Sequence, residues 1–296
     1  MITVAGLTKR YGDVLAVDDL SFTVEPGAVT GFLGANGAGK STTMRMILGL
    51  DAPTAGTATI GGRRYRDLEH PVRTVGALLD PRCAHPGRTG RDHLRWMAVA
   101  AGIGRVRVDE VLEAVGLAGA ADRRVGGYSL GMRQRLGIAG ALLGDPEVVL
   151  LDEPLNGLDP DGIRWVRELL RGLAAQGRTV FVSSHLLNEV EHTAERVVVI
   201  GHGRLIATGA IADLLGRTAV LRVTAADPVE TAELATALAW AGGRVEPDGD
   251  GLTVRGLAAE TAGRIALDRG IALRELATHV RGLEETFHAL AHGGAA

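Results

Sequence analysis

The stretch from Gly34 to Thr42, Gly-Ala-Asn-Gly-Ala-Gly-Lys-Ser-Thr, constrains the fold of this chain more than any other. An apolar run, Val29 to Leu33, comes directly before it, and a helical pattern follows. Glycines let backbone N–H groups turn toward phosphate oxygens, and the N-terminus of the next helix favours negative charge. This order predicts a phosphate-binding P-loop made by Gly34, Asn36, Gly37, Ala38, Gly39, Lys40, Ser41 and Thr42.

Two side chains of this loop carry most of the predicted chemistry. Lys40 is expected to reach the β- and γ-phosphates of a bound nucleotide, and the Ser41 hydroxyl is expected to ligate Mg²⁺. The alternative is a chance match in a chain that contains 42 glycines. Lysine occurs only at Lys9 and Lys40, so a lysine at this position by accident has a likelihood of about one in a few hundred.

The charge of the chain is nearly balanced, since 32 basic and 35 acidic residues give a net charge of -3 and are spread along the sequence. No basic run is visible, so nucleic acid is not an expected partner. The N-terminus lacks the features of a signal peptide, and no window of about 18 apolar residues could form a transmembrane helix. We therefore expect a cytoplasmic protein that depends on another chain for any work at a membrane.

At 296 residues the chain is long enough for two domains. Its first part, from Ile2 to Leu33, alternates apolar runs with turns and predicts an antiparallel β-layer. Residues 90–144 change to a helical pattern, which predicts an all-helical insertion between strands. Tyr11 lies in the first turn, where it is either an ordinary turn aromatic or a ring that stacks on a nucleotide base.

Two adjacent carboxylates follow an apolar run that ends at Leu151. Because ligands bind at the carboxyl edge of open α/β sheets, Asp152 is expected to hold Mg²⁺ through its water shell. Glu153 points the other way along the pleat and is expected to polarise an attacking water. Without the P-loop, two solvated carboxylates at a strand end would be the preferred interpretation.

A second apolar strand, 179–183, leads to His185 at the same predicted edge. This histidine could donate a hydrogen bond to the γ-phosphate, whereas a surface or capping role is the alternative. Ser129 precedes a further helix, and a helix N-cap alone would explain it.

Taken together, these stretches resemble the ATP-binding cassette of ABC transporters over residues 1 to about 215. Gly34 to Thr42 looks like Walker A, Val148 to Glu153 like Walker B with its catalytic glutamate, Asn156 to Asp159 like the D-loop, and His185 like the switch histidine. Tyr11 falls where the family has its adenine-stacking aromatic. The resemblance implies a two-lobed α/β P-loop domain, with a mixed sheet, an antiparallel β-layer and a helical subdomain at about 88–145, in which two copies sandwich two ATP molecules.

Two positions depart from the family pattern. The signature, usually Leu-Ser-Gly-Gly-Gln, is Tyr-Ser-Leu-Gly-Met here, so Ser129, Gly131 and Met132 would contact the ATP of the partner copy. Loss of the first glycine and the glutamine implies that this signature binds the partner's ATP less strongly. Asp80 stands where the family usually has the Q-loop glutamine; a carboxylate can still ligate Mg²⁺, and the alternative is a poorly coupled ATPase.

Three stretches, 76–80, 183–191 and 283–287, look like those of drug-resistance exporters of the daunorubicin and bacitracin type. In such systems the ATPase and the membrane permease are separate chains. The resemblance therefore implies that this chain forms a homodimer on ATP binding and contacts a permease on the inner face of the membrane. A soluble cassette ATPase acting on ribosomes or DNA is the main rival. Its relatives usually carry two cassettes or a long coiled coil, and neither is visible here. A nucleotide-binding regulator without turnover is a weaker rival.

After the first domain, 1–216, the pattern changes again. Residues 217–296 read as strand, helix, hairpin, helix and strand, with the hairpin turn at 248–251 and a last helix at 283–292. This order predicts a small α+β domain of ferredoxin-like type. It contains no recognisable catalytic constellation, and fold alone does not supply a function.

Overall fold

The computed structural model of the chain describes residues 1–82, 84–216 and 220–279. They fall into two units, the first spanning Met1–Ile211 and the second beginning at Ala212. In the described part of the chain, no helix combines the length and the apolar character that a membrane crossing requires.

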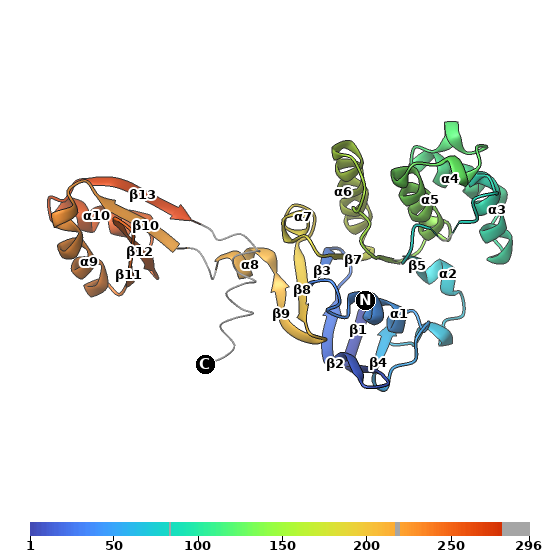
Figure 1. Cartoon of the computed structure of the whole chain (residues 1–296), viewed down its shortest axis with the longest axis horizontal. Coiled ribbons are helices and arrows are strands. Elements are labelled where there is room, and N and C mark those ends of the chain that lie inside the picture. Colours follow the sequence, from blue (N-terminus) through green and yellow to red (C-terminus); the bar gives the residue numbers. More distant parts are fainter. Residues whose placement is uncertain (83, 217–219, 280–296) are drawn as a thin grey trace. The chain divides into compact units, whose positions relative to one another are not determined.

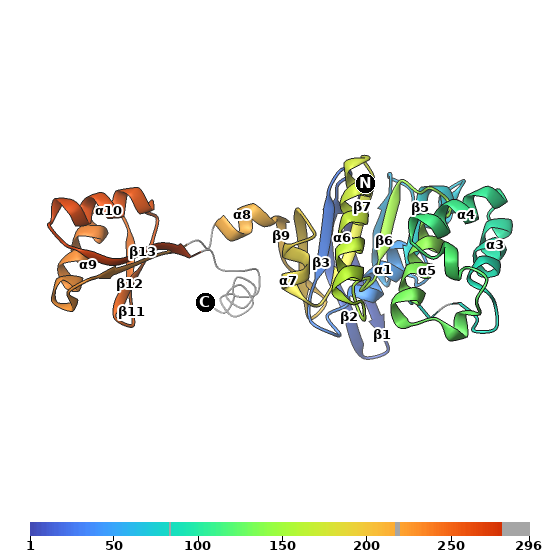
Figure 2. The same ribbon diagram turned by 90° about the horizontal axis from the view of Figure 1, so that it is seen from above.

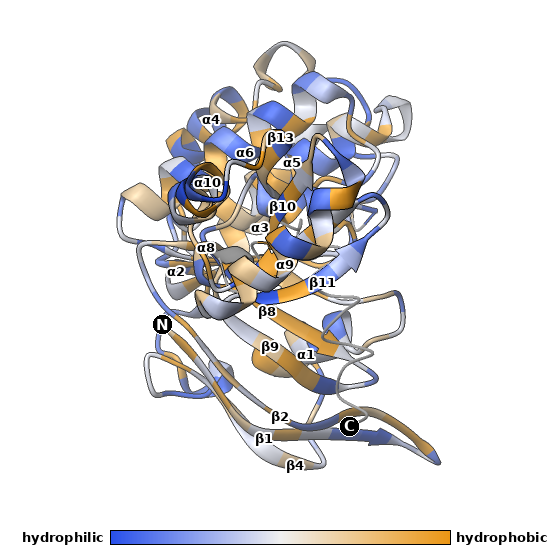
Figure 3. Cartoon of the chain, turned by 90° about the vertical axis from the view of Figure 1, so that its left-hand side faces the viewer, coloured by the Kyte–Doolittle hydropathy of each residue, from blue (hydrophilic) through white to orange (hydrophobic). Residues whose placement is uncertain are grey.

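A six-stranded sheet of order β5-β6-β7-β3-β8-β9 forms the centre of the first unit (Figure 1). Its strands are β3 (Val29–Leu33), β5 (Val75–Leu78), β6 (Val148–Leu151), β7 (Thr179–Ser184), β8 (Arg196–Gly201) and β9 (Arg204–Ala210). Neighbouring strands run parallel except for β9, which pairs antiparallel with β8. Along β7, Val180 and Val182 face one core while Phe181 faces the other. Burial on both faces explains why the parallel strands read as nearly unbroken apolar runs, as Figure 3 shows for β8; β9, at the edge, is partly exposed.

An antiparallel sheet of order β2-β1-β4 covers one face of the central sheet. Its strands are β1 (Ile2–Tyr11), β2 (Val14–Val24) and β4 (Ala55–Ile60); the P-loop helix α1 (Lys40–Ile47) and the short helices η1 (Tyr65–Asp67) and α2 (Pro71–Thr74) belong to the same part of the chain. Three rings join the two sheets: Phe22, Phe32 and Phe181 have centroids 5.0 to 5.7 Å apart. This core supports the strand from which the P-loop leaves.

A helical subdomain is inserted between β5 and β6 (Figure 2). It contains α3 (Gly90–Ala100), α4 (Arg105–Ala114), η2 (Ala118–Ala120), η3 (Val125–Gly127) and α5 (Leu130–Leu142). Leu94, Val111 and Leu136, one from each long helix, are buried in a shared cluster that reaches the central sheet. The helix α6 (Pro160–Ala175) packs on the same face, and α7 (Leu187–Glu191) and α8 (Ile211–Gly216) follow later in the chain.

The second unit is a four-stranded antiparallel sheet with two helices on one face. Its elements are β10 (Val220–Ala225), η4 (Pro228–Glu230), α9 (Thr231–Trp240), β11 (Arg244–Asp248), β12 (Gly251–Arg255), α10 (Ala259–Asp268) and β13 (Leu273–His279). The strand order is β11-β12-β10-β13, as in the split βαβ arrangement of ferredoxin-like folds. Val223, Leu234 and Ala262 belong to its separate core.

The predicted fold class, a mixed P-loop α/β domain with an antiparallel layer, a helical insertion and an α+β C-terminal region, is confirmed. The helix after the P-loop ends at Ile47, because Gly49 takes a left-handed conformation with φ 65°. The stretch 283–287 and the helix predicted at 283–292 lie outside the described residues.

Candidate nucleotide-binding and hydrolysis site

The P-loop follows a path that only glycine permits at two of its positions. A Cβ atom on Gly34 would lie 2.6 Å from the carbonyl oxygen of Ile200. Gly39 has φ 104° and caps α1, and a Cβ there would lie 2.6 Å from the carbonyl oxygen of Ala16. The sequence of glycines therefore fixes a narrow backbone loop ahead of α1, as a phosphate cradle requires.

Lys40 begins α1 and is only 6 % exposed. Its Nζ donates to the carbonyl oxygen of Gly34 at 2.7 Å and lies 3.5 Å from Glu153 Oε1. Since the first turn of α1 holds no acidic residue, the positive end of this helix is not neutralised locally. In the same loop Asn36, Gly37 and Ser41 are exposed, Gly39 and Thr42 are partly buried, and Ala38 is buried.

The two carboxylates stand directly after β6, where the strand leaves the sheet. Asp152 is 7 % exposed, and its backbone N–H donates to the carbonyl oxygen of Leu78 at 2.7 Å. Glu153 has φ 50°, a left-handed conformation that is unfavourable for a residue with a Cβ. Such strained residues concentrate at functional sites, where the surrounding structure holds them in place.

Three predicted site residues form a continuous chain of polar contacts. Glu153 Oε1 lies 3.5 Å from Lys40 Nζ, and Glu153 Oε2 lies 2.9 Å from Nδ1 of His185, which directly follows β7. A carboxylate held between an ammonium group and an imidazole is fixed in orientation, as a group that positions a water molecule must be. The structure thus brings the P-loop, the carboxylate pair and His185 to one edge of the sheet.

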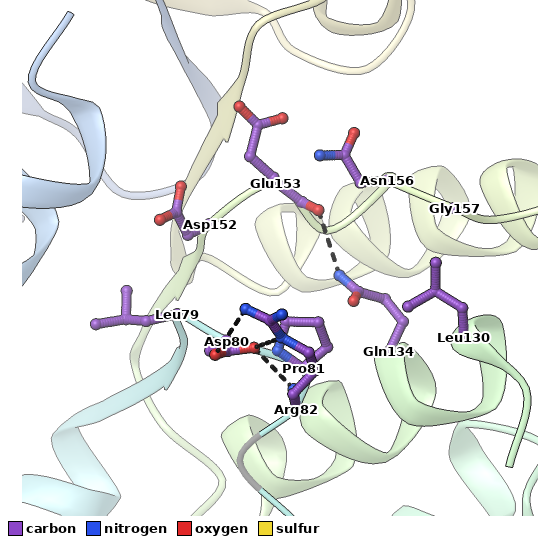
Figure 4. A pocket seen from close by; sticks show the side chains of 10 residues that line it. All are labelled: Leu79, Asp80, Pro81, Arg82, Leu130, Gln134, Asp152, Glu153, Asn156 and Gly157. Atoms are coloured by element: carbon purple, nitrogen blue, oxygen red, sulfur yellow. Dashed lines mark hydrogen bonds and ion pairs between the residues drawn. The ribbon is translucent and has the colours of Figure 1, made fainter. Parts of the chain in front are cut away.

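Two further residues belong to this site, although sequence reasoning did not single them out. Ser183, the penultimate residue of β7, donates to Asp152 Oδ1 and accepts from the backbone N–H of Glu153 at 2.8 Å. Gln134 of α5 donates to the carbonyl oxygen of Glu153 at 3.4 Å, as Figure 4 shows. For Ser183 the available signal was a polar residue at the end of an apolar run, whereas Gln134 lies between two arginines and gave no such signal. Both residues are about 1 % exposed or less.

Asp80 follows β5 and is turned toward Arg82 (Figure 4). It accepts from the Arg82 backbone N–H at 2.8 Å and from Arg82 Nε at 3.2 Å, and these bonds hold the pKa of Asp80 below its usual value. Asp80 lines an open pocket of about 440 Å³ together with Asp152 and Glu153. Its role as a Mg²⁺ ligand stays a prediction, because the side chain is engaged by Arg82 within the loop.

Tyr11, at the end of β1, has a ring that is held in place and 46 % exposed. Its hydroxyl donates to Asp51 Oδ2 at 2.8 Å, and Arg45 of α1 forms an ion pair with the same carboxylate. The hydrogen bond to Asp51 raises the pKa of Tyr11. Lys9 Nζ lies 4.7 Å from the centre of the ring. An anchored and accessible ring is suited to stacking on a base, and this role also stays a prediction.

The signature residues lie in a different surrounding. Ser129 caps α5 and accepts from the Met132 backbone N–H at 3.2 Å, and Asp159 caps α6 by accepting from Gly162 N–H at 2.8 Å. One hollow is lined by Ser129, Leu130, Gly131, Met132, Arg135, Gly157, Leu158 and Asp159. Within the described residues, no hydrogen bond or ion pair joins the signature residues to Lys40, Glu153 or His185.

The residues present fit ATP and Mg²⁺. Gly34 and Gly39 allow a narrow backbone loop in which a Cβ atom would collide with neighbouring backbone oxygens. Lys40 supplies a buried positive charge. Asp152 provides a mostly buried carboxylate with one oxygen fixed by Ser183, and oxygen ligands of this kind suit Mg²⁺.

Comparison with known proteins agrees with this geometry. A family model described as "ABC transporter" matches residues 17–156, and one described as a domain of unknown function matches residues 219–284. The bacitracin transport ATP-binding protein BcrA of Bacillus licheniformis is 44 % identical over 209 residues, which are 70 % of this chain and 68 % of the relative. The Nod factor export ATP-binding protein I of Burkholderia orbicola is 42 % identical over 207 residues, 68 % of each chain.

Among solved structures, a dimeric ATP-binding cassette in a post-hydrolysis state, bound to ADP and Pi, has a TM-score of 0.65. It is 25 % identical in sequence, and the match covers 71 % of this chain and 98 % of that one.

Proposed function

Since this chain belongs to the ABC transporter family, we propose that it is the ATP-hydrolysing subunit of a membrane exporter and works as a homodimer on a separate permease. Membership confirms the resemblance seen in the sequence and identifies the chain as an ATPase. The observation that carries the proposal is the contact chain Lys40, Glu153 and His185 at the edge of the central sheet.

In this proposal each residue has a defined task. The P-loop backbone and Lys40 bind the phosphates, which places the γ-phosphate beside Glu153. Glu153 orients a water molecule and accepts its proton, while His185 holds the glutamate and contacts the γ-phosphate. Mg²⁺, with Ser41 and Asp152 as its protein partners, supplies charge neutralisation on the phosphates.

Dimerisation follows from the separation of the two halves of the site. Ser129 and Gly131 lie at the start of α5 in the helical subdomain, and among the described residues neither forms a hydrogen bond or ion pair with Lys40 or Glu153. A second copy, placed head to tail, would bring its signature residues to the phosphates held by the first. The dimeric cassette solved with ADP and Pi supports this arrangement.

Export on the inner face of a membrane is supported by the relatives, which are named for bacitracin transport and Nod factor export. In this proposal the permease is a separate chain.

The test is to search the neighbouring genes for a six-helix membrane protein and to co-express this chain with it. We expect the chain to sediment with membranes only when that partner is present, and Glu153→Gln to sediment in the same way. Recovery with ribosomes or nucleic acid in both conditions would contradict the exporter role and favour a soluble cassette ATPase.

A further inference from the structure

Ser183 lies between the two carboxylate residues of the site. It is fully buried near the end of β7, next to β6 in the sheet. Its hydroxyl donates to Asp152 Oδ1, and its oxygen accepts the backbone N–H of Glu153 at 2.8 Å. One hydroxyl therefore contacts both the residue expected to face Mg²⁺ and the residue expected to face water.

The bond to Glu153 N–H matters because that residue is left-handed, with φ 50°. The Glu153 carbonyl is held from the other side, by Asn156 N–H at 3.2 Å and by Gln134 Nε2 at 3.4 Å. With both ends of the residue fixed, the side chain leaves the backbone in one direction, toward Lys40 and His185. Without the acceptor on Ser183, the Glu153 N–H would lose its partner in a partly buried surrounding, which favours a change of backbone conformation.

We propose that Ser183 is a positioning residue for ATP hydrolysis, which sets the orientation of the Asp152 carboxylate and the backbone conformation of Glu153 together. The inference rests on the proposed roles of these two residues. Groups that hold a metal-binding carboxylate by a hydrogen bond typically change metal affinity or activity by about tenfold to hundredfold when removed.

A purely structural role is the competing explanation, and Thr30 provides the matched control. Thr30 of β3 is 1 % exposed and pairs with Phe181 on β7, two residues before Ser183. Its hydroxyl has no hydrogen-bond partner in the described part of the chain. Thr30→Val therefore removes a buried hydroxyl from the same sheet without touching either carboxylate.

We expect Ser183→Ala to lower kcat by about tenfold to hundredfold, while ATP affinity measured in EDTA changes by less than about twofold. Mg²⁺ should strengthen ATP binding by about tenfold less in this variant than in the wild-type chain, a readout that does not depend on turnover. Thr30→Val should keep both values within about twofold of wild type. Equilibrium nucleotide binding with and without Mg²⁺, together with phosphate release, measures these quantities.

If Ser183→Ala fails to fold, Ser183→Cys keeps the same number of side-chain heavy atoms and replaces the hydroxyl by a weak donor and acceptor, so the same losses are expected. Wild-type turnover and an unchanged effect of Mg²⁺ in a folded Ser183 variant would overturn the positioning role alone. Absence of ATP hydrolysis by the wild-type chain would instead overturn the proposed function.

Discussion

Glu153→Gln is expected to lower steady-state ATP hydrolysis by about one hundredfold to ten thousandfold and to leave ATP binding unchanged. The amide has nearly the same shape as the carboxylate, so the phosphate cradle of the P-loop stays intact. It cannot accept the proton of the attacking water, and it loses the charge that pairs with Lys40 at 3.5 Å. Phosphate release and equilibrium binding of ATP measure the two effects separately.

Glu147 offers the matched control for this variant, because it is exposed and immediately precedes β6, at the end opposite Glu153. Glu147→Gln makes the same chemical change on the same strand and should hydrolyse ATP at the wild-type rate. Lys40→Ala should instead weaken ATP binding itself, because the proposed role of the lysine is to bind the phosphates. Unchanged phosphate release by Glu153→Gln would remove Glu153 from the catalytic role.

The second large effect is expected at Ser129, which caps α5. Aspartate is as good an N-cap as serine, so Ser129→Asp should preserve the stability of the helix. If Ser129 also contacts the γ-phosphate bound by a second copy, the new negative charge should lower turnover by about one hundredfold or more. Thermal unfolding and ATPase rate, measured on the same preparation, distinguish the two effects.

Ser129→Asn is the control at the same position, because asparagine caps as well as aspartate and carries no charge. It should lose less activity than Ser129→Asp and unfold at the same temperature. Wild-type turnover by Ser129→Asp would mean that Ser129 is an ordinary helix cap.

The position of Lys40, Asp152 and His185 at one edge of the sheet could be predicted from the sequence, because each segment follows a recognisable apolar strand. Asp152 and His185 directly follow β6 and β7, and the loop that leads to Lys40 leaves β3; parallel strands deliver their carboxyl ends to one edge. The left-handed Glu153 could not be predicted, since it results from bonds donated and accepted by residues far away in sequence.

The orientation of Asp80 could not be predicted from the family motifs. Arg82, two residues later, holds this side chain, because the turn places the backbone N–H and the guanidinium group of Arg82 beside the Asp80 carboxylate. Leu130 replaces a family glycine, and its side chain lies against Gly157, where a Cβ would be 2.1 Å from Leu130 Cδ2. The signature and the D-loop are therefore packed together within one chain.

In the second unit, the order of elements along the chain could be predicted, but the order of strands in the sheet could not. Turn residues and apolar alternation predicted the element order of β10 to β13, whereas the strand order β11-β12-β10-β13 depends on long-range pairing. No function follows from this topology.

The central claim is that ATP is hydrolysed at sites shared by two copies of this chain. Its most direct test is turnover per molecule across a wide dilution series of the complete wild-type chain, with sedimentation in ATP at the same concentrations. Mass action predicts that specific activity rises with protein concentration as the dimer forms. A constant specific activity, with only monomer in the presence of ATP, would contradict the claim.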